Sequence, residues 1–197
     1  MTDPEFWERG YSVAEDLIGP EQIAFTRAAM DASRRRGTLE AGVNRVLPQA
    51  ALNEYSPIGG EILLLQCRPA IEAVVGRGLI PAYAFWRIYE RGAALLRHKD
   101  RSSCEISATL TIHAAPADEL WPIHVTGLDG TTVALGLKPG AAAIYQGCEV
   151  PHWREAFSGE AQCQVFLHYV LADGPNAAFA FDGRDSLKIQ HRTSAEG

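Results

Sequence analysis

Two histidines and one aspartate are the residues of this chain best suited to hold a metal ion. His98 and Asp100 are separated by one residue, and His152 follows after 51 intervening residues. Residues i and i+2 of an extended backbone project to the same side, and a later strand folded alongside would add the second histidine. Two imidazoles and one carboxylate form the facial triad of non-heme iron sites, which leaves open coordination positions. The spacing is therefore compatible with iron ligation but is a weak signal by itself, because six histidines make a chance match of this kind common.

The elements that must position these ligands fall into two parts along the chain. Up to about Gly78 the pattern is helical: residues 20–36 repeat apolar side chains near the 3.6 period and end in three arginines. A second helix is expected over residues 69–75. From Tyr83 onward, short runs rich in β-branched and aromatic residues alternate with glycine, proline and aspartate, which is typical of strands and turns.

Eight such runs follow one another at short intervals, as in an all-β sandwich or barrel. The predicted strands are Tyr83–Glu90, Ala93–His98, Glu105–His113, Trp121–Thr126, Thr131–Leu137, Ala141–Gln146, His152–Ala156 and Cys163–Leu171. We therefore predict a mainly β fold with N-terminal helices (α+β), whose core is a double-stranded β-helix, the cupin-like jelly roll. A single domain would span residues 1–197, with a helical layer at 1–78, the jelly roll at 79–173 and a loop-like tail at 174–197.

Composition excludes several classes of protein. The 197 residues suit one domain, and a net charge of −6 disfavours nucleic acid as a bulk partner, because such binding needs clustered lysine and arginine. No apolar run approaches the length of a membrane span, and the acidic start is unlike a secretory signal. The four cysteines lack C-x-x-C spacing, so they are expected to be buried thiols of a cytoplasmic protein.

The ligand-bearing segments resemble the Fe(II)- and 2-oxoglutarate-dependent dioxygenases, specifically their prolyl-hydroxylase-like branch. The resemblance spans about residues 5–171 and is most specific where the two ligand segments occur in the correct order. The matching stretches are Phe6–Tyr11, Phe85–Tyr89, Leu95–Arg101, Cys104–Thr111, Gly140–Gly147 and Val150–Glu155.

That resemblance implies an enzyme with Fe(II) held by His98, Asp100 and His152, which uses 2-oxoglutarate and O2, with ascorbate as an accessory reductant. Hydroxylation of an unactivated C–H bond would accompany release of succinate and CO2. Halogenating relatives carry a small residue at the carboxylate position, so Asp100 favours hydroxylation. The substrate would be a small molecule, an amino acid or a peptide side chain; the sequence indicates no oligomeric state.

Strand alternation places several polar residues beside the expected iron site. The resemblance implies that Tyr89 hydrogen-bonds 2-oxoglutarate, and strand alternation turns Arg87 to the same side. Hydroxyl and apolar residues alternate over 105–111, so the hydroxyls would line the interior if the apolar face packs on the helices. A solvent-facing threonine row is the alternative. The interior residues proposed for cosubstrate binding are Ser107, Thr109, Thr111 and, on the last core strand, Gln164.

One departure from the family pattern concerns the anchor of the distal (C5) carboxylate of 2-oxoglutarate. The family places an arginine or lysine on the last core strand, where this chain has residues 161–164, Ala-Gln-Cys-Gln. A buried carboxylate needs a cationic partner. Arg154, two residues after His152, is the first candidate because its guanidinium offers a bidentate fork, and Arg87 is the second. A surface arginine paired with Glu155 or Glu160 is the alternative for Arg154.

Two other functions remain open at this point. A catalytically silent, cupin-like protein would keep the metal site for binding or sensing. A hydrolase or isomerase with the same ligands would hold Zn or Mn instead of iron. His113, His124 and His168 are expected to be structural residues of strands.

Overall fold

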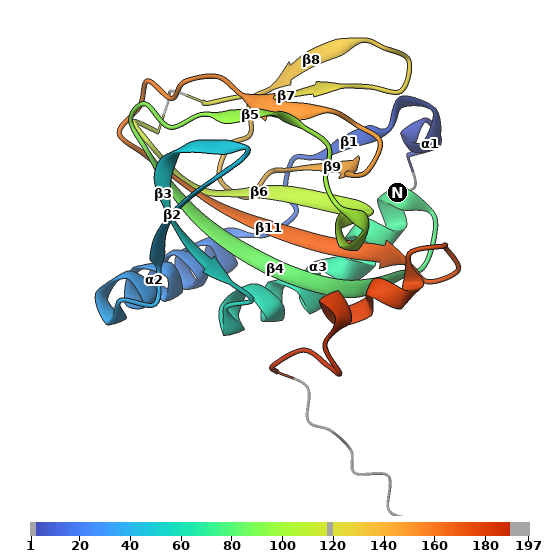
Figure 1. Ribbon diagram of the computed structural model, residues 1–197, viewed down its shortest axis with the longest axis horizontal. Coiled ribbons are helices and arrows are strands. Elements are labelled where there is room, and N and C mark those ends of the chain that lie inside the picture. The colour runs from blue at the N-terminus through green and yellow to red at the C-terminus, as the bar shows by residue number, and fades with distance from the viewer. Residues whose placement is uncertain (1–2, 118–119, 190–197) are drawn as a thin grey trace, which may run out of the picture.

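The computed structural model describes residues 3–117 and 120–189, in which two stacked antiparallel sheets are covered by helices on one side (Figure 1). The helical elements are α1 (Phe6–Arg9), α2 (Pro20–Arg36), α3 (Ile58–Val75), η1 (Ser102–Cys104) and η2 (Ala177–Gly183). The strands are β1 (Tyr11–Ala14), β2 (Glu40–Asn44), β3 (Leu47–Tyr55), β4 (Leu79–Glu90), β5 (Leu95–His98), β6 (Ile106–Ala115), β7 (Ile123–Thr126), β8 (Thr132–Leu135), β9 (Ala142–Gln146), β10 (His152–Arg154) and β11 (Ala161–Leu171).

The sheet order defines a jelly roll. The larger sheet runs β1-β9-β6-β11-β4-β3-β2 and the smaller one runs β5-β10-β7-β8. The eight strands from β4 to β11 form the two facing four-stranded sheets of a double-stranded β-helix, so the predicted fold class is confirmed. All eight predicted core strands are present, with ends shifted by a few residues.

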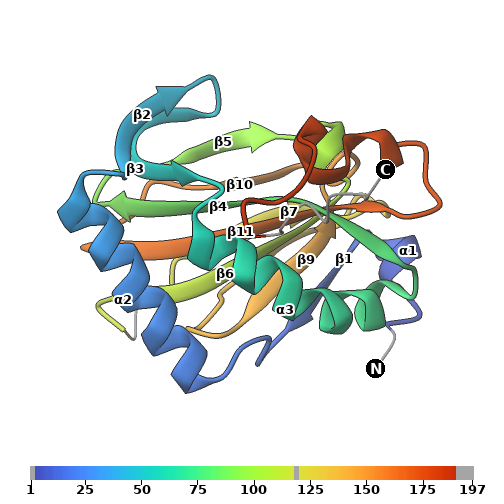
Figure 2. The same cartoon turned by 90° about the horizontal axis from the view of Figure 1, so that it is seen from below.

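Along strand β6, apolar and hydroxyl side chains point alternately to the two faces of the larger sheet. Ile106, Ala108 and Leu110 belong to the main hydrophobic core together with residues of α2 and α3. The intervening hydroxyl residues are equally buried but point to the opposite face, between the sheets. The helices lie across the outer face of the larger sheet (Figure 2), which leaves its inner face for polar side chains.

The two long helices differ in how well their bounds were predicted. Helix α2 has the predicted bounds: Pro20 occupies its first turn, and Gly37 ends it with a φ of 72°. The prediction of a helix starting at Pro69 was wrong, because α3 begins at Ile58 and contains Pro69 in its interior. Proline is favoured in a first helical turn, but here the packing of α3 on the sheet overrides that preference.

Three strands lie in the N-terminal part, for which we predicted only helices. Strand β1 extends the larger sheet beside β9, and the β2–β3 hairpin extends it beside β4. The hairpin turn is fixed by the side chain of Asn44, whose Oδ1 accepts hydrogen bonds from the backbone N–H groups of Val46 and Leu47 at 2.9 Å. The carbonyl of Val46 accepts a bond from Leu96 of β5, so the turn is held beside that strand.

The C-terminal segment packs against the domain, although a loop-like tail was expected from residue 174. Arg184 makes a 2.9 Å ion pair with Glu61, which is fully buried in α3. Asp182 pairs with Arg101, and the side chain of Leu187 is buried. Part of that expected tail, residues 190–197, lies outside the described residues.

Two further features concern the state of the cysteine thiols and the length and apolar character of the helices. All four cysteines are free thiols, and Cys67, Cys104 and Cys163 are buried. Within 3–117 and 120–189 no helix is both long and apolar enough to cross a membrane.

The core predicts a stability difference between two truncations. Leu110→Ala should lower the free energy of unfolding by about 3 kcal/mol, because it leaves a cavity beneath α2 and α3. Val43→Ala, at a side chain that is 63% exposed, should change it by less than about 0.5 kcal/mol. Denaturant titration measures both, and equal losses would contradict the assignment of this core.

Candidate active site

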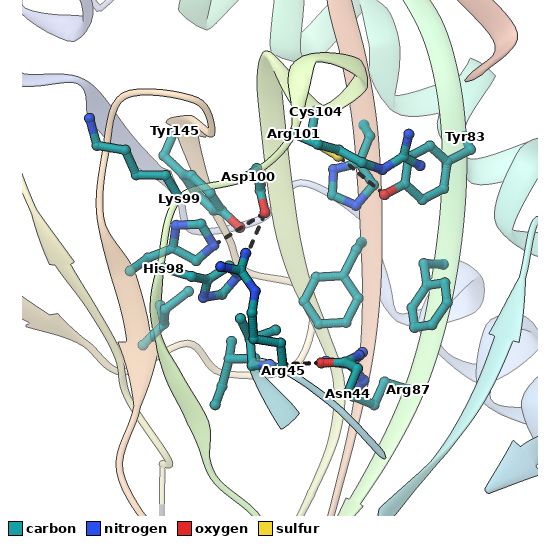
Figure 3. Close-up of a pocket in the computed structure, with 17 residues that line it drawn as sticks. Asn44, Arg45, Tyr83, Arg87, His98, Lys99, Asp100, Arg101, Cys104 and Tyr145 are labelled. Carbon is teal, nitrogen blue, oxygen red and sulfur yellow. Dashed lines mark hydrogen bonds and ion pairs between the residues drawn. The ribbon is translucent and has the colours of Figure 1, made fainter. Parts of the chain in front are cut away.

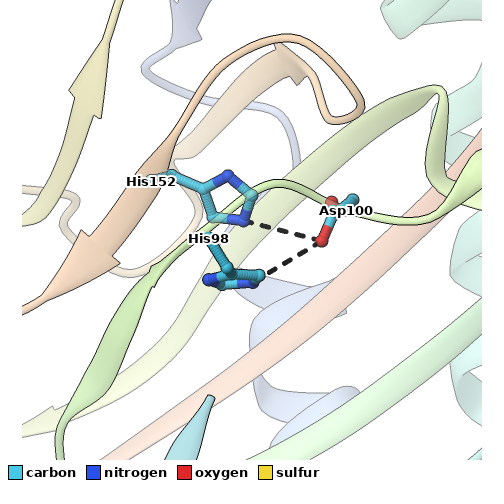
Figure 4. Close-up of side chains that lie close together, drawn as sticks. All are labelled: His98, Asp100 and His152. Carbon is cyan, nitrogen blue, oxygen red and sulfur yellow. Dashed lines mark ion pairs between the residues drawn. The ribbon is translucent and has the colours of Figure 1, made fainter. Parts of the chain in front are cut away.

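The three predicted metal ligands meet between the two sheets (Figure 4). Strands β5 and β10 pair with His98 opposite His152, and Asp100 follows two residues after the end of β5. The Oδ1 atom of Asp100 lies 3.7 Å from Nε2 of His98 and 3.6 Å from Nε2 of His152. One ligand atom from each residue lies within 4.8 Å of the others, so the three can share one ion. We call this set the triad.

Backbone carbonyl groups orient both imidazoles. Nδ1 of His98 lies 2.8 Å from the carbonyl oxygen of Leu96, and Nδ1 of His152 lies 2.9 Å from that of Val150. A carbonyl can only accept, so each Nδ1 carries the proton and each Nε2 presents a lone pair toward Asp100. Burial, followed by the neighbouring imidazole of His152, lowers the pKa of His98, which keeps that ring neutral and able to bind a metal.

Asp100 is held from both its backbone and its side chain. Its N–H donates to the carbonyl of Gly147 at 2.9 Å, and its Oδ2 accepts a bond from the hydroxyl of Ser107 at 2.9 Å. Burial raises the pKa of Asp100, but the neighbouring imidazoles of His152, His168 and His98 lower it more, so the net shift is downward. The group is therefore a carboxylate, the form that a cation requires.

A second cluster shares Asp100 with Cys104 and His168. Burial raises the pKa of the Cys104 thiol, which also contacts the hydroxyl of Tyr83 at 3.1 Å. Burial lowers the pKa of His168 to about 4, and its Nδ1 lies 2.9 Å from the hydroxyl of Ser107. The Cys104 thiol and Nδ1 of His168 already have hydrogen-bond partners, whereas both Nε2 atoms of the triad face one carboxylate oxygen, so the triad is the better metal site.

The polar residues predicted for the interior do lie there. Thr109, Thr111 and Gln164 are completely buried. The amide of Gln164 accepts a bond from Thr109 at 3.1 Å and donates one to Thr111 at 2.8 Å, so the three side chains form one network across β6 and β11. Tyr89 is also fully buried, and its hydroxyl accepts a 3.0 Å bond from Arg87.

The two candidate arginines have different surroundings. Arg154 is 2% exposed, its guanidinium lies 4.8 Å from the ring of Trp121, and Nη1 donates to the carbonyl of that residue. Its Nε and Nη2 atoms have no hydrogen-bond partner in the described part of the chain. Burial lowers the pKa of Arg154 to about 10, so it still carries its charge at neutral pH. Neither Glu155 nor Glu160 pairs with it in the described structure.

The triad borders a cavity of about 410 Å³ (Figure 3). Arg87 lines this cavity, whereas Arg154 is not among its described lining residues. Tyr145 of β9 also lines it and packs against the ring of His152 at 4.6 Å. The size is typical of a small-ligand site.

Sequence reasoning missed the contribution of the β2–β3 turn. Asn44, Arg45 and Val46 line the cavity, and Figure 3 shows the side chain of Arg45 extending from the turn toward the triad. The turn sequence contains no glycine and the following strand contains Pro48, so neither part carried a hairpin signal. His113 and His124 do not line this cavity, and His168 does.

Known proteins match this chain in structure. No family model and no curated protein sequence matches it. A prolyl-4-hydroxylase from Pseudomonas putida aligns with a TM-score of 0.66 at 17% identity, over 84% of this chain and 94% of that one. The epimerase SnoN from nogalamycin biosynthesis, solved with Fe3+, α-ketoglutarate and nogalamycin RO, aligns with a TM-score of 0.69 at 11% identity, over 85% and 81%.

A third match is a prolyl hydroxylase from Trichoplax adhaerens in complex with a peptide fragment of the hypoxia inducible factor oxygen degradation domain. Its TM-score is 0.67 at 9% identity, over 84% of this chain and 86% of that one. The chain thus has the fold of the Fe(II)- and 2-oxoglutarate-dependent oxygenases, as its sequence motifs predicted.

Close packing around Gly147 generates a prediction for the metal site. A Cβ atom at this position would overlap the carbonyl of Cys104 and lie 2.7 Å from Oδ2 of Asp100. Gly147→Ala should therefore displace Asp100 and weaken Mn(II) binding about 10- to 100-fold, as loss of support for a metal ligand commonly does. Isothermal titration calorimetry measures the affinity. Gly19→Ala, where an added Cβ meets no atom within 4 Å, is the control, and unchanged affinity in G147A would contradict this geometry.

Proposed function

We propose that this protein is a non-heme Fe(II)- and 2-oxoglutarate-dependent dioxygenase that hydroxylates an unactivated C–H bond. The observation that carries the proposal is the triad itself, in which two oriented imidazoles and one carboxylate converge inside a jelly roll. The prolyl-4-hydroxylase, SnoN and the peptide-bound prolyl hydroxylase share this fold, and SnoN was solved with iron and α-ketoglutarate. The substrate would be a small metabolite, an amino acid or a peptide side chain.

The residues of the triad fit Fe(II). Nitrogen and carboxylate ligands suit this ion, and all three ligands line the cavity, which leaves space for further ligands of the metal. Bound iron, with 2-oxoglutarate and O2, supplies an oxidant strong enough to hydroxylate a C–H bond, with succinate and CO2 as coproducts. The carboxylate of Asp100 fills the third ligand position, which supports hydroxylation over halogenation.

In this proposal the distal carboxylate of 2-oxoglutarate also binds in the interior. A buried guanidinium with two unpartnered donors is costly, and a carboxylate would satisfy both in a bidentate pair. Arg154 meets this description and lies on the same strand as His152. We therefore propose Arg154 as the anchor that replaces the basic residue missing at 161–164, and Tyr89, Thr109, Thr111 and Gln164 as further buried residues of the cosubstrate site.

The other buried residues have supporting tasks in this proposal. The carbonyls of Leu96 and Val150 fix the imidazole rings, and Ser107 fixes one carboxylate oxygen, so the ligands need little rearrangement on binding. The rings of Tyr145 and Trp121 pack against His152 and Arg154 and exclude water from them.

The free thiols support a reducing, cytoplasmic location.

Triad variants test the proposed reaction. Anaerobic addition of Fe(II) and 2-oxoglutarate to the purified protein should produce a visible charge-transfer band, and air should then yield succinate. His98→Ala, Asp100→Ala and His152→Ala should each remove the band and reduce succinate to background, because each removes one of three ligands. A fully active variant at any of these positions would contradict the ligand assignment. A band without succinate from any trial substrate would favour a silent binding protein.

Arg154 variants test the anchor. Arg154→Ala should raise the 2-oxoglutarate concentration that half-saturates the band by about a hundredfold, because losing one partner of a buried ion pair costs about 2–5 kcal/mol. Mn(II) affinity without 2-oxoglutarate should stay within about threefold of wild type, and Arg154→Lys should recover part of the loss. Equal 2-oxoglutarate affinity in R154A and wild type would remove Arg154 from this role, and a loss in Arg87→Ala alone would assign the role to Arg87.

A further inference from the structure

The cavity beside the triad has a charge opposite to that of the whole chain. The protein carries a net charge of −6. Its cavity is nevertheless lined by four cationic residues and a single carboxylate, which is the metal ligand Asp100. The cations are Arg45, Arg87, Lys99 and Arg101. A concave site lined by one sign of charge attracts ligands of the opposite sign.

Two of these cations are neutralised by partners outside the cavity. Lys99 lies 3.6 Å from a carboxylate oxygen of Glu149, and Arg101 makes a 2.6 Å ion pair with Asp182. Arg45 and Arg87 have no carboxylate partner within the described residues. Arg87 is instead hydrogen-bonded to two neutral groups, the amide of Asn53 at 2.6 Å and the hydroxyl of Tyr89 at 3.0 Å. Both arginines therefore keep an uncompensated charge.

The cofactors of the proposed function do not compensate these two charges. A divalent iron ion and one aspartate leave one positive charge, and dianionic 2-oxoglutarate makes the sum negative by one. The guanidinium of Arg154 returns that sum to zero. This step rests on the proposed function, in which Arg154 holds the cosubstrate. Arg45 and Arg87 are then left for a third component of the reaction, which is the substrate.

Both arginines are placed to act on a molecule beside the triad. Arg45 projects from the β2–β3 turn toward the triad (Figure 3), and the turn is held against β5 by the bond between Val46 and Leu96. Arg87 lies on β4, with its guanidinium carbon 5.2 Å from the ring of Phe85 and 5.6 Å from that of Phe166. The two phenylalanines also line the cavity. The site thus combines anion-binding groups with an apolar surface.

We propose that the substrate is an organic acid whose carboxylate or phosphate binds to Arg45 and Arg87 while its apolar part packs on Phe85 and Phe166. Guanidinium groups bind both kinds of anion through paired hydrogen bonds. A cavity of about 410 Å³ suits a small acid. Fixing the acidic group on the side of β4 and the β2–β3 turn would leave the rest of the molecule to face the triad.

Calorimetry with matched probes tests this inference on the anaerobic protein saturated with Fe(II) and 2-oxoglutarate. The probes are 3-phenylpropionate with its neutral amide, and phenyl phosphate with phenol. At least one acid should bind about tenfold or more tightly than its neutral counterpart, and added salt should weaken that binding. The stronger acid identifies the anion as carboxylate or phosphate. Arg45→Gln and Arg87→Gln should each weaken it about tenfold, whereas Arg35→Gln, an exposed site on α2, should not.

Three results would overturn the inference: neutral probes that bind as tightly as the acids, acid binding that is unchanged in R45Q, or no acid binding at about 10 mM. The charge-transfer band, recorded on the same samples, separates the two proposals. A wild-type protein that lacks the band argues against the oxygenase function. A protein that shows the band but binds acids independently of Arg45 contradicts the substrate class alone. R45Q should retain the wild-type band, which shows that the metal site is intact.

Discussion

The pairing of strands β5 and β10 is the constraint on which the site depends. It places His98 opposite His152, which is far from it in sequence, and the turn after β5 brings the carboxylate of Asp100 beside both rings. The backbone carbonyls two residues before each histidine then direct both Nε2 atoms at one carboxylate oxygen. The convergence of the three ligand atoms is therefore built from backbone geometry, and the loop through Gly147 holds Asp100 in place.

The same architecture explains why so many polar groups are buried between the sheets. The helices remove the outer face of the larger sheet from water, and this face supplies most of the hydrophobic core. The inner face can therefore carry hydroxyl, amide and guanidinium groups, provided that they are paired. Ser107, Thr109, Thr111 and Gln164 satisfy one another or Asp100, whereas Arg154 keeps two donors without a partner. That contrast is the reason for proposing Arg154, among these interior residues, as the one that binds a ligand.

Much of the fold and the ligand set could be predicted from sequence, because both rest on local patterns. The alternation in β6 and the spacing of His98 and Asp100 are visible without coordinates. The hairpin that carries Arg45 could not be predicted from the sequence, because β2 is exposed, β3 contains Pro48 and the turn lacks glycine. The start of α3 at Ile58 was missed for a related reason. Pro69 resembles the first residue of a helix, and only the tertiary packing shows that it lies in the interior of α3.

The most direct test of the central claim is an anaerobic crystal structure of the protein with iron and 2-oxoglutarate, recorded at the iron absorption edge. We predict one anomalous peak within bonding distance of Nε2 of His98, Nε2 of His152 and a carboxylate oxygen of Asp100, with the distal carboxylate of 2-oxoglutarate on Arg154. A peak among Asp100, Cys104 and His168, or no ordered iron between the sheets, would contradict it.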